Sequence, residues 1–150
     1  MRIVLQRVKK ASVSIDDRLY SSIGNGYMLL VGIENDDTSE DIEWLAAKIC
    51  SMRIFSDEEG KMNLDIKQVN GEILIVSQFT LHASTKKGNR PSFIKAARPE
   101  VAIPLYEKLI AETEKLMQKP SKSGVFGADM QIELINDGPV TIILDSKNKE

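Results

Sequence analysis

Two short apolar segments constrain the fold of this chain more than any other feature of its sequence. Residues 27–33 form a continuous apolar run, and residues 72–78 (EILIVSQ), with four consecutive apolar side chains, are the best strand-type segment; each follows a turn signal, Gly24-Asn25-Gly26 and Asn70-Gly71 respectively. The longer apolar run, residues 27–33, is far shorter than the roughly 20 apolar residues of a membrane helix, and such a run is typical of a strand covered on both faces. The chain must therefore supply cover for both faces of a sheet.

Further strand-type segments accompany these two runs. Residues 11–15 alternate apolar and polar side chains, which is the period of a half-buried strand, and Asp16-Asp17 then predicts a turn. We also expect strands over residues 2–8, 19–23, 129–135 and 140–145. A hairpin turn at 136–138 is expected to separate the last two.

Two segments have the apolar spacing of an amphipathic helix. The first begins at Thr38, where Asp41 three residues later completes a capping-box-like pattern. The second extends from about 99 to 117, and Pro104 must lie in its first turns because a later proline would remove a helical hydrogen bond. Many strands and two well-separated helices predict one α+β domain over residues 1–150, built in layers.

The composition excludes several classes of protein. With 42% hydrophobic and 28% charged residues, the chain is not largely disordered, and its net charge of −2 does not by itself indicate a nucleic-acid-binding protein. One cysteine and one histidine exclude a Cys/His zinc cluster and an internal disulfide. We expect a soluble cytoplasmic protein that does not enter a membrane and uses neither metal nor cofactor.

No standard catalytic motif is present. The sequence lacks a phosphate-binding loop, a dinucleotide fingerprint, a zinc-protease motif and a nucleophile elbow. His82 is the only imidazole, so a hydrolase with a Ser-His or Thr-His pair would have to use it, but a histidine at the edge of the core is the better interpretation. Cys50 lies near the apolar side of the first helix and is read as a buried structural thiol.

Two short segments nevertheless concentrate polar and turn-forming residues. Ser77-Gln78-Phe79-Thr80-Leu81 places two hydroxyls and an amide at the end of the best strand, where sites are commonly assembled. Asn136-Asp137-Gly138-Pro139-Val140-Thr141 suits a hairpin, although Pro139 would remove a ladder donor there. Each could be an ordinary strand end or turn.

Together these segments carry a resemblance. With the N-terminal MRIVLQRV and the shorter stretches KMNL, NRPSF and GVFGADM, they make nearly the whole chain similar to the D-aminoacyl-tRNA deacylase family of the bacterial and eukaryotic type. The resemblance implies a barrel-like β/β/α fold, in which packed β-sheets have two main helices on one side. It also implies hydrolysis of the ester between a D-amino acid, or glycine, and the 3′-terminal adenosine of tRNA. Removal of glycine mischarged onto alanine tRNA is the second implied activity.

The resemblance further implies a homodimer with two sites at the subunit interface, in which a Gly138-Pro139 loop from one chain reaches the catalytic segment of the other. The implied catalytic residues are Ser77, Gln78, Phe79 and Thr80. The implied substrate-binding residues are Gly138, Pro139, Asn136, Thr141, Phe126, Met130 and Arg7. We expect a cis Gly138-Pro139 bond and a filter that rejects L-aminoacyl groups.

The stretch from 86 to 98 carries five cations and no acid, so a non-catalytic RNA-binding module is the alternative function. Its basic residues are Lys86, Lys87, Arg90, Lys95 and Arg98. If the protein is instead the enzyme, we expect these cations to contact phosphates near the acceptor end of tRNA.

Overall fold

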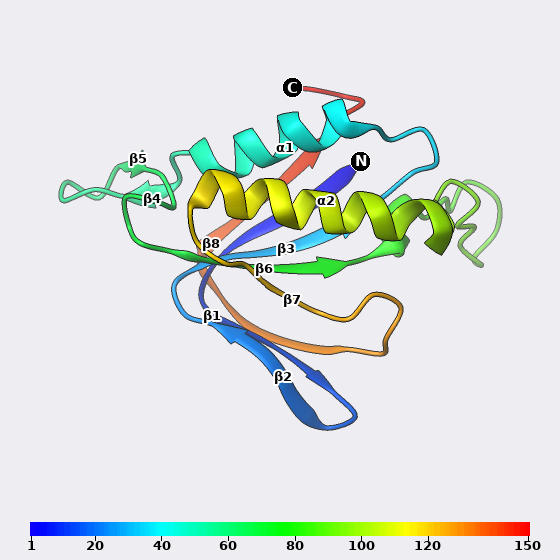
Figure 1. Ribbon diagram of the computed structural model, residues 1–150, viewed down its shortest axis with the longest axis horizontal. Coiled ribbons are helices and arrows are strands. Elements are labelled where there is room, and N and C mark those ends of the chain that lie inside the picture. The colour runs from blue at the N-terminus through cyan, green and yellow to red at the C-terminus, as the bar shows by residue number, and fades with distance from the viewer.

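A curled, mixed β-sheet with two helices on one side makes up the protein, whose computed structural model describes residues 1–150 (Figure 1). The sheet contains β1 (Arg2–Ile15), β2 (Arg18–Ile23), β3 (Gly26–Gly32), β6 (Glu72–Ser77), β7 (Lys122–Ser123) and β8 (Gln131–Asp145). A separate hairpin contains β4 (Phe55–Ser56) and β5 (Met62–Leu64). The helices are α1 (Ser39–Ser51), α2 (Pro99–Met117) and the short 3₁₀ helix η1 (Phe79–His82). The predicted α+β layered fold is confirmed.

The long strand β1 organises the sheet. On one edge its first half pairs with β3 and its second half with β2, while β8 pairs along the other edge, all antiparallel. β6 then adds parallel to β3, and β7 parallel to β6. The sheet curls until β2 meets β7, where Ser21 Oγ donates a hydrogen bond of 2.9 Å to the Ser123 carbonyl. This near-closure gives the barrel-like form that the resemblance implied.

The central strands β3 and β6 are buried on both faces, as the apolar run of β3 predicts. Tyr27, Leu29 and Ile75 belong to the large core cluster that also includes residues of both helices. Met28 and Leu74 point the other way and pack with residues of β1 and β2 in a second cluster. Two hydrophobic layers therefore hold the sheet between them.

Both helices begin where the sequence predicts. The Thr38 N–H donates to Asp41 Oδ2 at 2.7 Å, so the capping box is present at the start of α1. α2 begins with Pro99, and Pro104 lies inside its second turn, where it removes the helical hydrogen bond that the Glu100 carbonyl would otherwise accept. Neither helix is long and apolar enough to cross a membrane.

Two strand predictions are wrong in the same way. Residues 2–8 and 11–15 belong to one strand, β1. Residues 131–135 and 140–145 likewise belong to one strand, β8, whereas residues 129 and 130 lie outside it. The predicted hairpin at 136–138 is therefore absent, because both halves of β8 pair with β1 rather than with each other. The Asp-Gly pair forms a bulge instead: Thr141 lies opposite Gln6 and Asn136 opposite Val8, with four residues of β8 in between.

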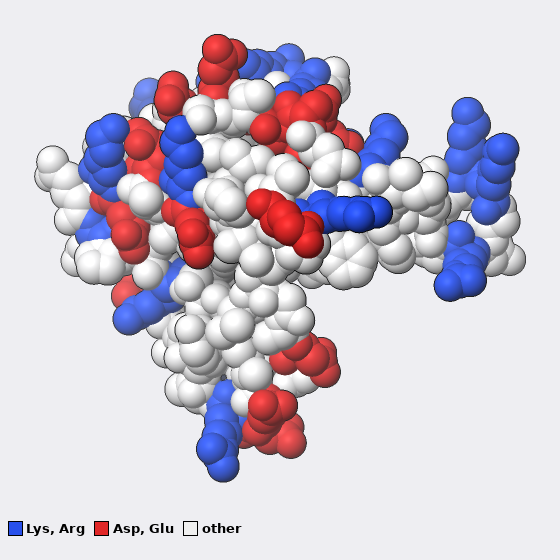
Figure 2. All heavy atoms as spheres, turned by 45° about the vertical axis from the view of Figure 1, so that its right-hand side comes forward, with Lys and Arg blue, Asp and Glu red and all other residues white.

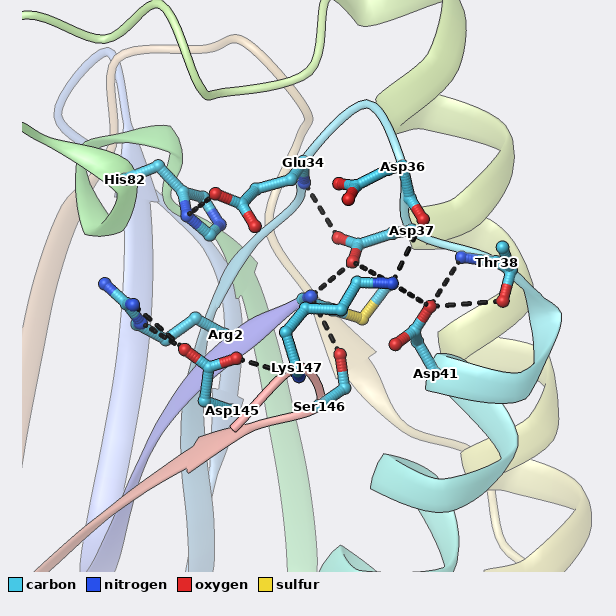
Figure 3. Close-up of polar contacts among 11 residues, drawn as sticks. Arg2, Glu34, Asp36, Asp37, Thr38, Asp41, His82, Asp145, Ser146 and Lys147 are labelled. Carbon is cyan, nitrogen blue, oxygen red and sulfur yellow. Dashed lines mark hydrogen bonds and ion pairs between the residues drawn. The ribbon is translucent and has the colours of Figure 1, made fainter. Parts of the chain in front are cut away.

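The two ends of the chain meet in a polar cluster beside α1 (Figure 3). The buried Met1 ammonium pairs with the buried Asp37 carboxylate and donates to Ser146 Oγ at 2.9 Å. Lys147 reaches Asp41 Oδ2 at 2.9 Å. Burial opposes ionisation of Asp41, but hydrogen bonds from Ser146, Lys147 and Thr38 outweigh burial and lower the pKa of this carboxyl. The cluster fastens the first and last strands to the helical layer.

Candidate functional site

A cavity of about 280 Å³ opens where β6 ends. Ser77, Gln78 and Phe79 line it from the strand end, and Phe126 and Met130 line it from the loop before β8. The walls are mostly apolar, with a few polar groups, as is usual for a small-molecule site. The structure thus brings together five of the predicted site residues from segments about fifty positions apart in the chain.

The chain changes direction at Gln78. Its N–H donates to the Val31 carbonyl at 2.7 Å, and its backbone (φ −147°, ψ 84°) ends β6 and leads into η1. The Gln78 amide then donates to Thr80 Oγ1. Thr80 itself is exposed and is not part of the cavity wall. Phe79 and Thr80 head the first turn of η1, where backbone N–H groups lack partners within a helix.

Aromatic rings frame the cavity. Phe79 is 56% exposed, and its ring meets that of Phe93 edge-on at 5.1 Å. Phe126 rests on Tyr106 at 5.9 Å, and the Tyr106 hydroxyl donates to the Ile75 carbonyl at 2.7 Å. Burial raises the pKa of Tyr106, so its hydroxyl stays neutral and serves as a structural donor.

The cavity wall contains one ionisable side chain, Asp129. Sequence reasoning missed it, because it occupied an unassigned position between Ala128 and Met130; its place beside two predicted residues was the available signal. His82 is buried away from the cavity, with Nδ1 3.2 Å from Glu34 Oε1. No group of three or more His, Cys, Asp or Glu side chains could hold a metal ion.

The remaining predicted residues gather at the bulge of β8. The buried Arg7 donates from Nε to the Asp137 carbonyl at 3.2 Å and lies 3.1 Å from its carboxylate. The Asn136 amide donates to the Arg7 and Val140 carbonyls at 3.0 and 2.9 Å, and Thr141 reaches Asn136 Oδ1 at 3.5 Å. These contacts give the bulge a fixed shape.

Gly138 is required at the tip of this bulge. Its φ is +124°, and a Cβ there would lie 2.8 Å from Val140 Cγ2 and 3.0 Å from Arg7 Nη2. The Gly138-Pro139 peptide bond is cis, as expected. Neither residue lines the cavity at Ser77–Phe79, so within one chain the two predicted groups form separate sites.

The basic stretch forms a projecting loop after η1 (Figures 1 and 2). The five basic residues of this loop are all exposed: Lys86, Lys87, Arg90, Lys95 and Arg98. None of them takes part in an ion pair within the chain. The base of the loop is tied to the cavity, because the Ala97 N–H donates to the Ile33 carbonyl at 2.8 Å and Ala97 lines the wall.

The chain that carries this strand-end cavity, aromatic rim and basic loop is similar to known proteins along nearly its whole length. The family model described as D-Tyr-tRNA(Tyr) deacylase matches residues 4–145. The D-aminoacyl-tRNA deacylases of Cytophaga hutchinsonii and Parabacteroides distasonis are 63% and 61% identical to this chain over 150 residues. Each match covers all of this chain and all of the relative.

Two solved structures share the fold. One is called c-Myc DNA Unwinding Element Binding Protein (TM-score 0.91, 41% identity) and is matched over 97% of this chain and 98% of that one. The other, a probable eukaryotic D-amino acid tRNA deacylase, has a TM-score of 0.81 at 18% identity, over 95% and 97% of the two chains, and supports the fold alone. The chain belongs to the D-Tyr-tRNA(Tyr) deacylase family. The prediction of a hydrolase that acts on aminoacyl-tRNA is confirmed.

Proposed function

We propose that this protein cleaves the ester of D-aminoacyl-tRNA, and of glycine mischarged onto alanine tRNA, in the cavity at Ser77–Phe79, in the cytoplasm. The observation that carries the proposal is the convergence of Ser77, Gln78 and Phe79 with Phe126 and Met130 on one small cavity at a strand end. A cavity of about 280 Å³ is near the lower end of the usual range for small ligands, which suits an aminoacyl group rather than a larger molecule.

Hydrolysis here needs no side-chain nucleophile. Water adds to the ester carbonyl carbon, the carbonyl becomes an oxyanion, and the bond to the ribose oxygen breaks to leave the free amino acid and tRNA. The Phe79 and Thr80 N–H groups stabilise the oxyanion, and one such donor typically contributes about 2.7–4 kcal/mol. Gln78 and Ser77 shape the pocket, and Gln78 holds the Thr80 hydroxyl in place.

The Gly138-Pro139 bulge of the partner subunit in a homodimer discriminates between D- and L-aminoacyl groups. Arg7, Asn136 and Thr141 hold the bulge rigid, and a rigid backbone can exclude a side chain from one face of the substrate's α-carbon. Because the bulge and the cavity are separate within one chain, a complete site requires two copies. An L-side chain is rejected, whereas a D-side chain or the hydrogen of glycine fits.

The basic loop binds the tRNA near its acceptor end. Its five unpaired cations adjoin the cavity through Ala97, so phosphates bound there lie close to the reacting ester. The alternative function, a non-catalytic nucleic-acid-binding module, uses the same loop. The name of the structural relative at 41% identity, which refers to DNA binding, makes this alternative worth testing directly.

The test is release of amino acid from tRNA charged with a D-, an L- or an achiral amino acid. We expect turnover of D-aminoacyl-tRNA and of glycine on alanine tRNA, and none of the L-forms. Thr80→Val and Gln78→Ala should each lower kcat, whereas Thr85→Val, the same change at an exposed threonine just before the basic stretch, should not. Binding of tRNA without turnover of any ester supports the alternative, and a covalent aminoacyl–Thr80 species trapped by rapid quench would contradict the mechanism.

A further inference from the structure

The 3₁₀ helix η1, which carries the proposed oxyanion donors, is short. It has only four residues, and such helices have poorer hydrogen-bond geometry than an α-helix. Phe79 and Thr80 are exposed, and the start of η1 is held by the edge-on contact of Phe79 with Phe93 and by the hydrogen bond from Gln78 to Thr80, whereas the buried His82 anchors its end. Leu81 and His82 pack closely against Gly32 of β3, and a polar contact from another element adds to this packing in setting the position of η1.

One side chain, that of Arg2 at the start of β1, hydrogen-bonds the backbone of η1. Arg2 Nη1 donates to the Leu81 carbonyl at 2.9 Å. Its Nε and Nη2 both donate to Asp145 Oδ2, at 3.0 and 2.9 Å (Figure 3). The guanidinium thus joins η1 to the end of β8.

The fork of Arg2 is held in one orientation by the sheet. Arg2 lies directly opposite Asp145 on β8 and opposite Gly32 on β3, so its backbone is paired on both sides. Burial disfavours the charge of Asp145, but the hydrogen bonds from Arg2 and from the Lys147 N–H, together with the positive charges of Arg2 and the N-terminus, outweigh burial and lower the pKa of this carboxyl. Because the guanidinium is planar and two of its nitrogens donate to a carboxylate, the position of the third nitrogen, Nη1, has little freedom.

We propose that Arg2 is a positioning residue for the deacylation, which holds the Leu81 carbonyl and thereby sets where the Phe79 and Thr80 N–H groups point. This inference rests on the proposed function, because it takes η1 as the catalytic segment. Arg2 touches no substrate atom; it acts through the backbone of η1. Displacement of a catalytic group by about 1 Å can cost on the order of a hundredfold in rate, so loss of this contact should reduce kcat rather than substrate binding.

The experiment compares Arg2→Ala with Arg53→Ala. Arg53 is the matched control, because its Nε likewise donates to a backbone carbonyl, that of Asn63 in the β4–β5 hairpin. In Arg2→Ala we expect kcat to fall at least about tenfold with KM nearly unchanged. Hydrogen exchange at residues 79–82 should quicken. Added guanidinium ion should restore part of kcat, because the side chain it replaces is 41% exposed. Arg53→Ala should show none of these effects.

Each other outcome overturns the inference, and the outcomes separate it from the proposed function. Wild-type kcat with unchanged exchange at 79–82 refutes the role of Arg2 and leaves the site on η1 intact. Faster exchange at 79–82 with wild-type kcat refutes it too, and also contradicts the placement of catalysis on η1. A loss of kcat that guanidinium does not restore, or that Arg53→Ala shares, indicates a general loss of structure instead.

Discussion

Replacing Asp37 with asparagine tests whether the buried ion pair at the chain ends holds the fold together. The Asp37 carboxylate and the Met1 ammonium both have 0% relative side-chain exposure. The second carboxylate oxygen accepts the Glu34 N–H at 2.8 Å. An asparagine at this position would have one acceptor oxygen and one NH₂ group, so in either orientation a donor would face a donor.

The expected loss of folding stability in Asp37→Asn follows from the burial of the Met1 ammonium, which remains without its carboxylate partner. Removing one member of a buried pair leaves an uncompensated charge and typically costs about 3–5 kcal/mol. For a domain of this size each kcal/mol corresponds to roughly 2–4 °C, so we expect Tm to fall by roughly 6–20 °C. Lys147, 3.7 Å from the same carboxylate, would lose a partner as well but keeps Asp41.

Asp36→Asn is the matched control, because it makes the same change of charge one residue away on an exposed side chain. Surface substitutions of this kind usually change stability by about 0.5 kcal/mol or less. Urea melts at neutral pH should be made on protein whose first residue is Met1 with a free amine. Equal midpoints for the two variants, or a loss below about 1 kcal/mol in Asp37→Asn, would refute the reasoning.

Three further predictions concern other parts of the molecule. Gly138→Ala should lose about 1–3 kcal/mol in a denaturant melt, because its φ of +124° strains any side chain there; an unchanged midpoint would refute this. His82→Ala should melt earlier but keep most of its kcat and its pH–rate profile, whereas loss of a limb of that profile would reveal a general base. Neutralising Lys86 and Lys87 together should raise KM for aminoacyl-tRNA and flatten its salt dependence at constant kcat; a wild-type salt slope would make the loop a mere solvated surface.

The pH dependence of stability provides one more test, at Asp41. Because its folded-state pKa is lowered, the ionised carboxyl stabilises the fold above the ordinary range near pH 4. That contribution is lost as the pH falls from there through the lowered value. Asp41→Asn should therefore flatten the acid side of the stability curve, and a wild-type acid transition in this variant would contradict the assignment.

The sequence predicted those elements whose signal is local. The apolar runs of β3 and β6, the capping box at Thr38 and the limits of α2 depend on neighbours within a few residues, so periodicity and caps were sufficient. The bulge at Gly138 was read as a hairpin turn, because Asp-Gly suits both and only the partner strand decides between them.

The site divides in the same way. The motif at Ser77–Thr80 could be found from the sequence, but the contribution of Asp129 and the Arg2–Asp145 pair could not. Arg2 and Asp145 are 143 positions apart and meet only because β1 pairs with β8. The exclusion of Thr80 from the cavity wall follows from the direction in which η1 leaves β6, which no local pattern encodes.

The pairing of β1 with β8 also has a consequence for how the protein is made. β1 is synthesised first, but one of its edges forms hydrogen bonds only with β8, residues 131–145, which is synthesised last of the strands. Such a distant closure gives a high contact order, which slows folding, and meanwhile leaves β1 with an unsatisfied edge open to strands of other nascent chains. The sheet can therefore be completed only after residues 131–145 have been made, and until then the open edge of β1 exposes the chain to misassembly.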